Sequence, residues 1–156
     1  MQILIKSRAE IEEMAQSPFT KPTALISITD AGWTFAELEN KPHHLLQLAF
    51  DDVDNDIFED EFDGLFTQEK RLRIEQKYHM LSDEQAKQIA EFYAAVKDKV
   101  HNLICQCEHG QSRSAAVAAA ITQYEYNDGI KIFANDKYYP NKEVFKKVLK
   151  QLDGGM

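Results

Sequence analysis

A cysteine and an arginine separated by five residues mark the segment of this chain most suited to chemistry. The segment ICQCEHGQSRSAAVAAAI runs from Ile104 to Ile121, and the pair is Cys107 and Arg113. Backbone N–H groups at a helix start have no acceptor within the helix, and the helix dipole adds positive potential. The intervening residues are enough to curl such donors around one tetrahedral anion, and Arg113 can clamp two of its oxygens. The spacing predicts a site for a phosphate-type or sulfate-type anion.

The same positive potential acts on the sulfur of Cys107. A thiol at a helix N-terminus beside an arginine ionises more readily than a free cysteine. A thiolate at the base of a phosphate cradle is a nucleophile aimed at phosphorus, and Ser114 can donate its hydroxyl to the sulfur when the sulfur departs. Without that role, Cys107 would be a small buried apolar residue and Arg113 half of a surface ion pair. Ser112 and Ser114 could each cap the helix, which is compatible with catalysis.

The overall charge restricts the partners of such a site. The chain carries 26 acidic and 18 basic residues, a net charge of −8. Nucleic-acid and membrane-surface binding need a basic footprint, so we expect neither. Positive potential for an anionic substrate must therefore be concentrated locally, as it is around Arg113.

Length, hydropathy and cysteine content indicate one domain in a reducing compartment. The 156 residues form a single expected domain, 1–156, with a sizeable core. No apolar run approaches the roughly 18–20 residues that span a bilayer, and the opening MQILIKSRAE does not resemble a signal peptide. The two cysteines, Cys105 and Cys107, are too few for a disulfide framework, and their spacing does not match a CxxC motif. We expect a cytoplasmic protein.

The elements that position the loop alternate between strands and helices. Short β-branched or apolar runs predict strands at Gln2–Lys6, Thr23–Thr29, His44–Phe50 and His101–Gln106. Capping residues and apolar stripes predict helices from Ser7 to about Ala15, from Ser82 to about Lys99, over Arg113–Tyr126 and after Asn141. A further exposed helix is expected within Gly64–Met80. This alternation predicts an α/β fold, a central mostly parallel sheet with helices on both faces.

Residues 107–114, CEHGQSRS, resemble the CxxGxxR[ST] signature of cysteine-dependent protein phosphatases, most closely the compact dual-specificity group. The segments LLQLAFDDVDND and YYPNKEVFKKVLKQL resemble that group's general-acid strand and closing helix, whereas Asn55–Leu81 is longer than expected. The resemblance implies a protein-tyrosine-phosphatase-like fold, Cys107 as nucleophile, Arg113 as phosphate clamp and Ser114 as an aid to sulfur release. It implies no metal and no organic cofactor. The residues implied to bind phosphate are Glu108, His109, Gly110, Gln111, Ser112 and Arg113.

The same resemblance points to an aspartate that protonates the leaving group. Matching LQLAFDD to the family's strand end puts Asp52 in that place, with Asp51 as the second choice and Asp54 and Asp56 after it. Successive side chains on an extended chain point in opposite directions, so at most one of Asp51 and Asp52 should face the anion site.

The two residues that precede the nucleophile, Cys105 and Gln106, bear on its chemistry. Gln106 stands where the family usually has histidine, which predicts a thiol less acidic than in typical members. Cys105, two residues before Cys107, projects to the same side of an extended chain, so oxidation could join the two sulfurs. The competing interpretation of Cys105 is a buried strand residue.

These features favour a phosphomonoester hydrolase that forms a cysteinyl-phosphate intermediate and acts on a phosphorylated protein or another phosphomonoester. Two other hypotheses stay open. One is a rhodanese-like sulfurtransferase or arsenate reductase, which uses a cysteine in a similar anion loop. The other is a phosphatase-like module that binds phosphorylated partners without turnover.

Overall fold

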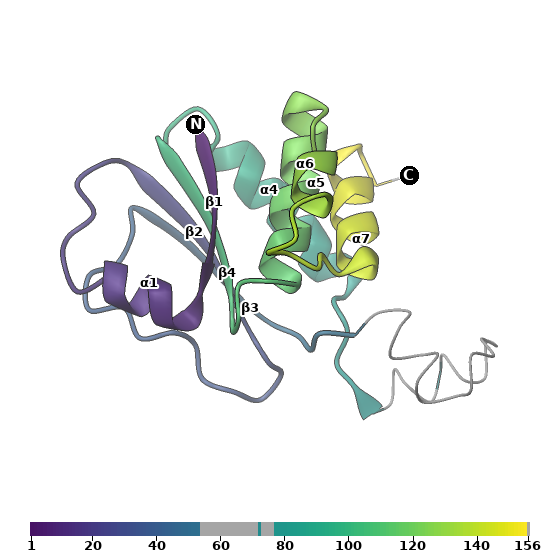
Figure 1. Ribbon diagram of the computed structural model, residues 1–156, viewed down its shortest axis with the longest axis horizontal. Helices are drawn as coiled ribbons and strands as arrows, with labels where there is room; N and C mark the ends of the chain where they lie inside the picture. Colours follow the sequence, from purple (N-terminus) through teal and green to yellow (C-terminus); the bar gives the residue numbers. More distant parts are fainter. Residues whose placement is uncertain (54–71, 73–76, 156) are drawn as a thin grey trace.

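A computed structural model describes residues 1–53, 72 and 77–155 (Figure 1). Its described part contains a sheet of four strands, with the spatial order β1-β4-β2-β3. The strands are β1 Gln2–Ser7, β2 Thr23–Thr29, β3 His44–Ala49 and β4 Asn102–Cys107. All three strand pairs are parallel, so the carboxyl ends of the strands meet at one edge of the sheet.

Helices cover both faces of this sheet, as the sequence predicts (Figure 1). Helix α1 packs against β1 and β4 from one face, while α4 and α5 pack on the other, with α7 against both of them and α6 against α5. The bounds are α1 Arg8–Met14, α4 Asp83–Val96, α5 Arg113–Tyr126, α6 Ile130–Phe133 and α7 Lys142–Leu152. The predicted α/β architecture is confirmed.

Local capping explains where three of the helices begin. Ser7 and Glu10 form a capping box at α1, and Ser82 and Gln85 form the same arrangement at α4. Asn141 accepts a hydrogen bond from the backbone of α7. These three starts are confirmed. The short helix α6 was not predicted, because its four residues carry too little periodicity.

Strands β4 and β2 are the two interior strands of the sheet and form much of the core. Strand β2 is buried along its whole length, and β4 is buried from Leu103 onward. Helix α5 lies against β4 with its residues Arg113–Thr122 all buried, because its many alanines let the backbone approach the sheet closely. The loop between β4 and α5 is therefore anchored by two buried elements.

The helix predicted within Gly64–Met80 falls largely outside the described residues, as do Asp54 and Asp56. Within the described part of the chain, no helix combines the length and the apolar character needed to cross a membrane.

Candidate active site

The loop between β4 and α5 turns sharply at a glycine. Gly110 has φ +68°, and a Cβ there would lie 2.7 Å from the backbone nitrogen of Ser7 and 2.8 Å from the carbonyl carbon of Lys6. Both neighbours belong to β1, which pairs with β4. Any side chain at this position would collide with fixed backbone as well as strain its own. The glycine lets the loop fold back on the strand end.

Cys107 ends β4 and lies at the base of this loop. Its Sγ is 3.0 Å from the Oγ of Ser114, in the first turn of α5. Cys107 is 2% exposed and Ser114 is fully buried. The structure thus brings together the predicted nucleophile and the hydroxyl predicted to assist it.

Arg113 is buried and only partly paired. Its Nη1 donates to Oδ1 of Asp30 at 2.7 Å and to the carbonyl of Phe50 at 2.7 Å. Its Nε is buried without an acceptor among the described residues, although the residue is only 4% exposed. A buried guanidinium nitrogen without a partner is costly unless an anion reaches it. Asp30 was not singled out from the sequence, since it lies 83 positions from Arg113.

The loop backbone offers further donors. Within the described part of the chain, no acceptor pairs with the backbone N–H groups of residues 109–113. The loop is held instead through its carbonyls: Gln111 accepts from the backbone of Tyr139 at 2.8 Å, and Ser112 accepts from that of Asn141 at 3.2 Å. Ser112 holds the N-cap position of α5 without a capping side-chain bond. Unpaired backbone N–H groups beside an unpaired guanidinium nitrogen are the kind of donors that a tetrahedral anion requires.

Asp52 lies against this loop. Its Oδ1 accepts hydrogen bonds from Ser112 Oγ and from Asn141 Nδ2, each at 2.8 Å. Asn141 also donates to the carbonyl of Val53 at 3.0 Å and accepts from Val144 N at the start of α7. Asn141 was expected only as a helix cap, and the structure shows that it also fixes Asp52 beside the loop.

Asp51 points elsewhere. Its two carboxylate oxygens accept from the backbone nitrogens of Ala31, at 3.1 Å, and His79, at 2.9 Å. The carboxylate therefore joins the backbones of two other chain segments. Only Asp52 of the two has its carboxylate bonded to the loop, in keeping with the expected alternation.

Gln106 supports the nucleophile's backbone. Its Nε2 donates to the carbonyl of Cys107 at 3.2 Å, and its Oε1 accepts from the hydroxyl of Ser27 on β2. The side chain is fully buried. Glutamine thus holds the strand end by neutral hydrogen bonds and brings no positive charge to the sulfur.

The first loop residue is fixed by an arginine that was not singled out from the sequence. Glu108 accepts from Arg8 Nε at 2.7 Å, and the Arg8 backbone N–H donates to the Glu108 carbonyl at 3.1 Å. Arg8 also donates to Thr29 Oγ1 at 2.9 Å and to the carbonyl of Thr34. The Glu108 carboxylate is therefore occupied by Arg8. His109 is exposed at the rim of the loop.

Cys105 belongs to the core. It is fully buried on β4, and burial, followed by the nearby Cys107, raises the pKa of its thiol to about 12. Such a thiol stays neutral at physiological pH, which favours the interpretation of Cys105 as a buried strand residue. Among the described residues, no group of three histidine, cysteine or acidic side chains could hold a metal ion.

Comparison with known proteins identifies the fold. No protein-family model matches the chain, and no curated protein matches it. Its structure is similar to the crystal structure of Tk-PTP in the active form, with a TM-score of 0.55 and 16% identity over 100% of this chain and 94% of that one. A human tyrosine phosphatase-like serine/threonine/tyrosine-interacting protein also matches, with a TM-score of 0.45 and 17% identity over 84% of this chain and 74% of that one. The chain has a protein-tyrosine-phosphatase-like α/β fold.

Proposed function

We propose that this protein is a cysteine-dependent phosphomonoester hydrolase. The observation that carries the proposal is the buried Arg113 Nε without an acceptor among the described residues, next in sequence to Ser114, whose hydroxyl lies 3.0 Å from the sulfur of Cys107. Nη1 is committed to Asp30 and Phe50, so the fork formed by Nε and Nη2 remains for two oxygens of a phosphoryl group. A thiol at the base of a site for a tetrahedral anion suits attack on phosphorus.

In the first step the Cys107 thiolate attacks phosphorus. An S–P bond forms as the bond from phosphorus to the leaving oxygen breaks, and Asp52 gives its proton to that oxygen. Arg113 and the loop N–H groups stabilise the charge on the phosphoryl oxygens. Ser112 and Asn141 hold Asp52 in place through its Oδ1.

In the second step water resolves the cysteinyl-phosphate. The Asp52 carboxylate takes a proton from the water, whose oxygen bonds to phosphorus as the S–P bond breaks. The sulfur leaves as a thiolate, and the Ser114 hydroxyl, 3.0 Å away, donates a hydrogen bond to it. The products are inorganic phosphate and the regenerated thiolate, and the proposed cycle uses no metal or organic cofactor.

The proposed substrates are phosphorylated proteins, with phosphotyrosine and phosphoserine or phosphothreonine as the groups removed. Support comes from the resemblance of residues 107–114 to the dual-specificity signature and from the fold shared with a tyrosine phosphatase.

Phosphate is expected to protect one cysteine from alkylation. Wild-type protein treated with iodoacetate should lose aryl phosphatase activity and carry the label on Cys107. Inorganic phosphate should slow both changes, because it fills the same site. Cys105 should stay unlabelled near neutral pH, because burial raises the pKa of its thiol to about 12. Peptide mapping by mass spectrometry gives the labelled position.

Turnover of the aryl phosphate should persist in the presence of a chelator. Modification of Cys105 in place of Cys107, or no protection by phosphate, would contradict the proposed site. Phosphate binding without any turnover by the wild-type protein would favour a binding module instead.

A further inference from the structure

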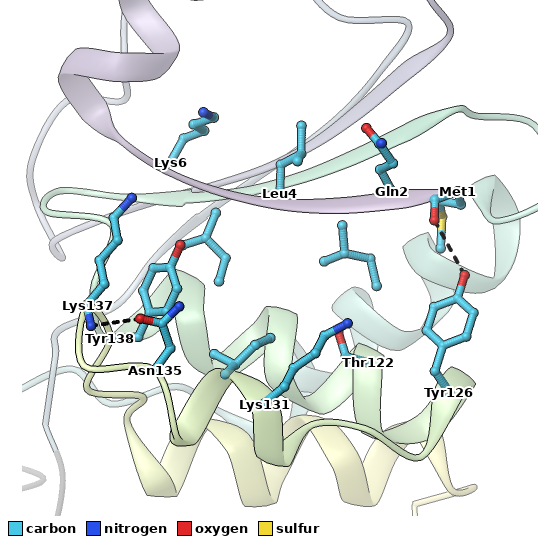
Figure 2. Close-up of a pocket in the computed structure, with 13 residues that line it drawn as sticks. Met1, Gln2, Leu4, Lys6, Thr122, Tyr126, Lys131, Asn135, Lys137 and Tyr138 are labelled. Carbon is cyan, nitrogen blue, oxygen red and sulfur yellow. Dashed lines mark hydrogen bonds between the residues drawn. The ribbon is translucent and has the colours of Figure 1, made fainter.

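A groove runs along the open edge of β1 (Figure 2). Its volume is about 840 Å³, and it lies between β1 on one side and α5, α6 and the segment after α6 on the other. The lining residues are Met1, Gln2, Ile3, Leu4, Ile5, Lys6, Thr122, Tyr126, Lys131, Ile132, Asn135, Lys137 and Tyr138. None of the described residues of the catalytic loop lines it, so the groove is separate from the anion site.

The strand edge in this groove offers unpaired main-chain groups. The backbone N–H of Gln2 donates to the carbonyl of His101 at 2.7 Å, on the β4 side. Alternate residues of a strand direct their N–H and C=O groups to the same neighbour. The corresponding groups of Ile3 and Ile5 therefore face the open edge, where no strand pairs with β1 in the described part of the chain. Such an edge is a template for an added strand.

The groove is basic in an acidic protein. Its lining includes Lys6, Lys131 and Lys137 and no carboxylate, although acidic residues outnumber basic ones by 26 to 18 in the chain. Asp128, outside the lining, pairs with Lys131 at 3.7 Å through exposed side chains. Exposed pairs of this kind are weak and can exchange for another carboxylate. The charge of the groove thus complements an acidic occupant.

One end of the groove lies next to the loop of the proposed catalytic site. Its Lys6 end lies under Gly110, whose added Cβ would touch the backbone of Lys6 and Ser7. Tyr138 lines the same end, and the next residue, Tyr139, donates its backbone N–H to the carbonyl of Gln111 in the loop. A chain bound along β1 would reach the loop within a few residues, since a strand advances about 3.3 Å per residue.

We propose that this groove binds an extended acidic segment of the phosphorylated protein substrate, which adds as a strand to β1. The inference rests on the proposed phosphatase function. Main-chain bonds to Ile3 and Ile5 would provide affinity, and carboxylates meeting Lys131 and Lys137 would provide selectivity. The phosphorylated residue would lie just beyond the segment, in the Cys107 loop. The strand edge recognises a peptide backbone, which favours protein over nucleic acid as the occupant.

Binding is tested first without phosphate. A fluorescein-labelled, unphosphorylated peptide of alternating glutamate and valine is expected to bind the full chain, as measured by anisotropy. The same peptide with glutamines for glutamates should bind about tenfold more weakly. The double variant Lys131→Glu/Lys137→Glu should lose about tenfold or more in affinity. The matched control Lys146→Glu/Lys150→Glu changes two exposed lysines on α7, outside the groove, and should bind as wild type does.

Strand addition is tested with N-methylated peptides. Methyl groups on alternate amides should abolish binding in one register and be tolerated in the other, because only alternate N–H groups of an added strand face β1. Equal binding of the glutamate and glutamine peptides, or unchanged affinity of Lys131→Glu/Lys137→Glu, would overturn the proposal. Equal loss of affinity for the two methylated peptides would also overturn it. So would tighter binding of a single-stranded oligonucleotide than of the glutamate peptide, if that binding depended on Lys131 and Lys137.

Kinetics connect the groove to catalysis. The variant Lys131→Glu/Lys137→Glu should have a kcat/KM about tenfold lower than wild type on a phosphotyrosine peptide with an acidic flank. Its turnover of a small aryl phosphate should stay unchanged. Equal loss on both substrates would contradict a docking role. Absence of phosphatase activity from the wild type would refute the proposed function alone, because the anisotropy experiment measures the groove independently.

Discussion

Replacing Cys107 with serine is expected to abolish phosphatase turnover. The loss should be on the order of 10⁴-fold or more, as for other enzymes that lose their nucleophile. A serine hydroxyl is not ionised at neutral pH, and no histidine among the described residues is bonded to this side chain to act as its base. Inorganic phosphate should still bind, since Arg113 and the loop N–H groups are unchanged. Steady-state hydrolysis of 4-nitrophenyl phosphate measures the first effect, and calorimetry measures the second.

Cys105→Ala is the matched control. This residue is buried two positions away on the same strand and has no part in the proposed chemistry. The control should remain active, and iodoacetate should still inactivate it. Its free energy of unfolding should fall, because a small cavity forms. If Cys107→Ser and Cys105→Ala both fold and are equally inactive, activity depends on the integrity of strand β4 and not on the Cys107 thiolate.

Replacing Asp52 with asparagine is expected to give the second largest effect, and the effect should depend on the leaving group. Turnover of phenyl phosphate should fall by about 10²–10⁴-fold, because phenolate departs slowly without a proton. Turnover of 4-nitrophenyl phosphate should fall much less, since 4-nitrophenolate is a stable anion. The amide can still accept from Ser112 or Asn141, so the loop should be preserved. Parallel kcat/KM measurements on the two esters give the ratio.

Asp51→Asn is the comparison for this substitution. The Asp51 carboxylate bonds to the backbone of Ala31 and His79, so the variant should lose stability and slow both esters alike. A leaving-group dependence in Asp51→Asn and none in Asp52→Asn would transfer the acid's role to Asp51. No effect of either substitution would show that the acid lies elsewhere.

Much of the fold could be predicted because its signals are local. An apolar, β-branched run identifies Thr23–Thr29 with the observed bounds, and the capping boxes at Ser7 and Ser82 begin their helices as predicted. The run of alanines likewise indicates the helix Arg113–Tyr126. Each of these features depends on residues a few positions apart, so the amino-acid sequence alone is enough to predict them.

The residues that hold the site side chains in place could not be predicted in this way. Asp30 meets Arg113, and Arg8 meets Glu108, only because the strand order places β1 and β2 on either side of β4. Asn141 reaches Asp52 across 89 positions of sequence. The sequence signature identifies the side chains that react, whereas the partners that orient them depend on contacts that appear only when the sheet assembles.

The central claim is that phosphate is transferred to Cys107 before water receives it. Wild-type protein mixed with a radiolabelled aryl phosphate and quenched in acid within milliseconds should carry label on the peptide that contains Cys107. The leaving phenol should appear in a burst equal to the amount of enzyme. Product formation with no labelled protein, or label on a different residue, would contradict the cysteinyl-phosphate mechanism.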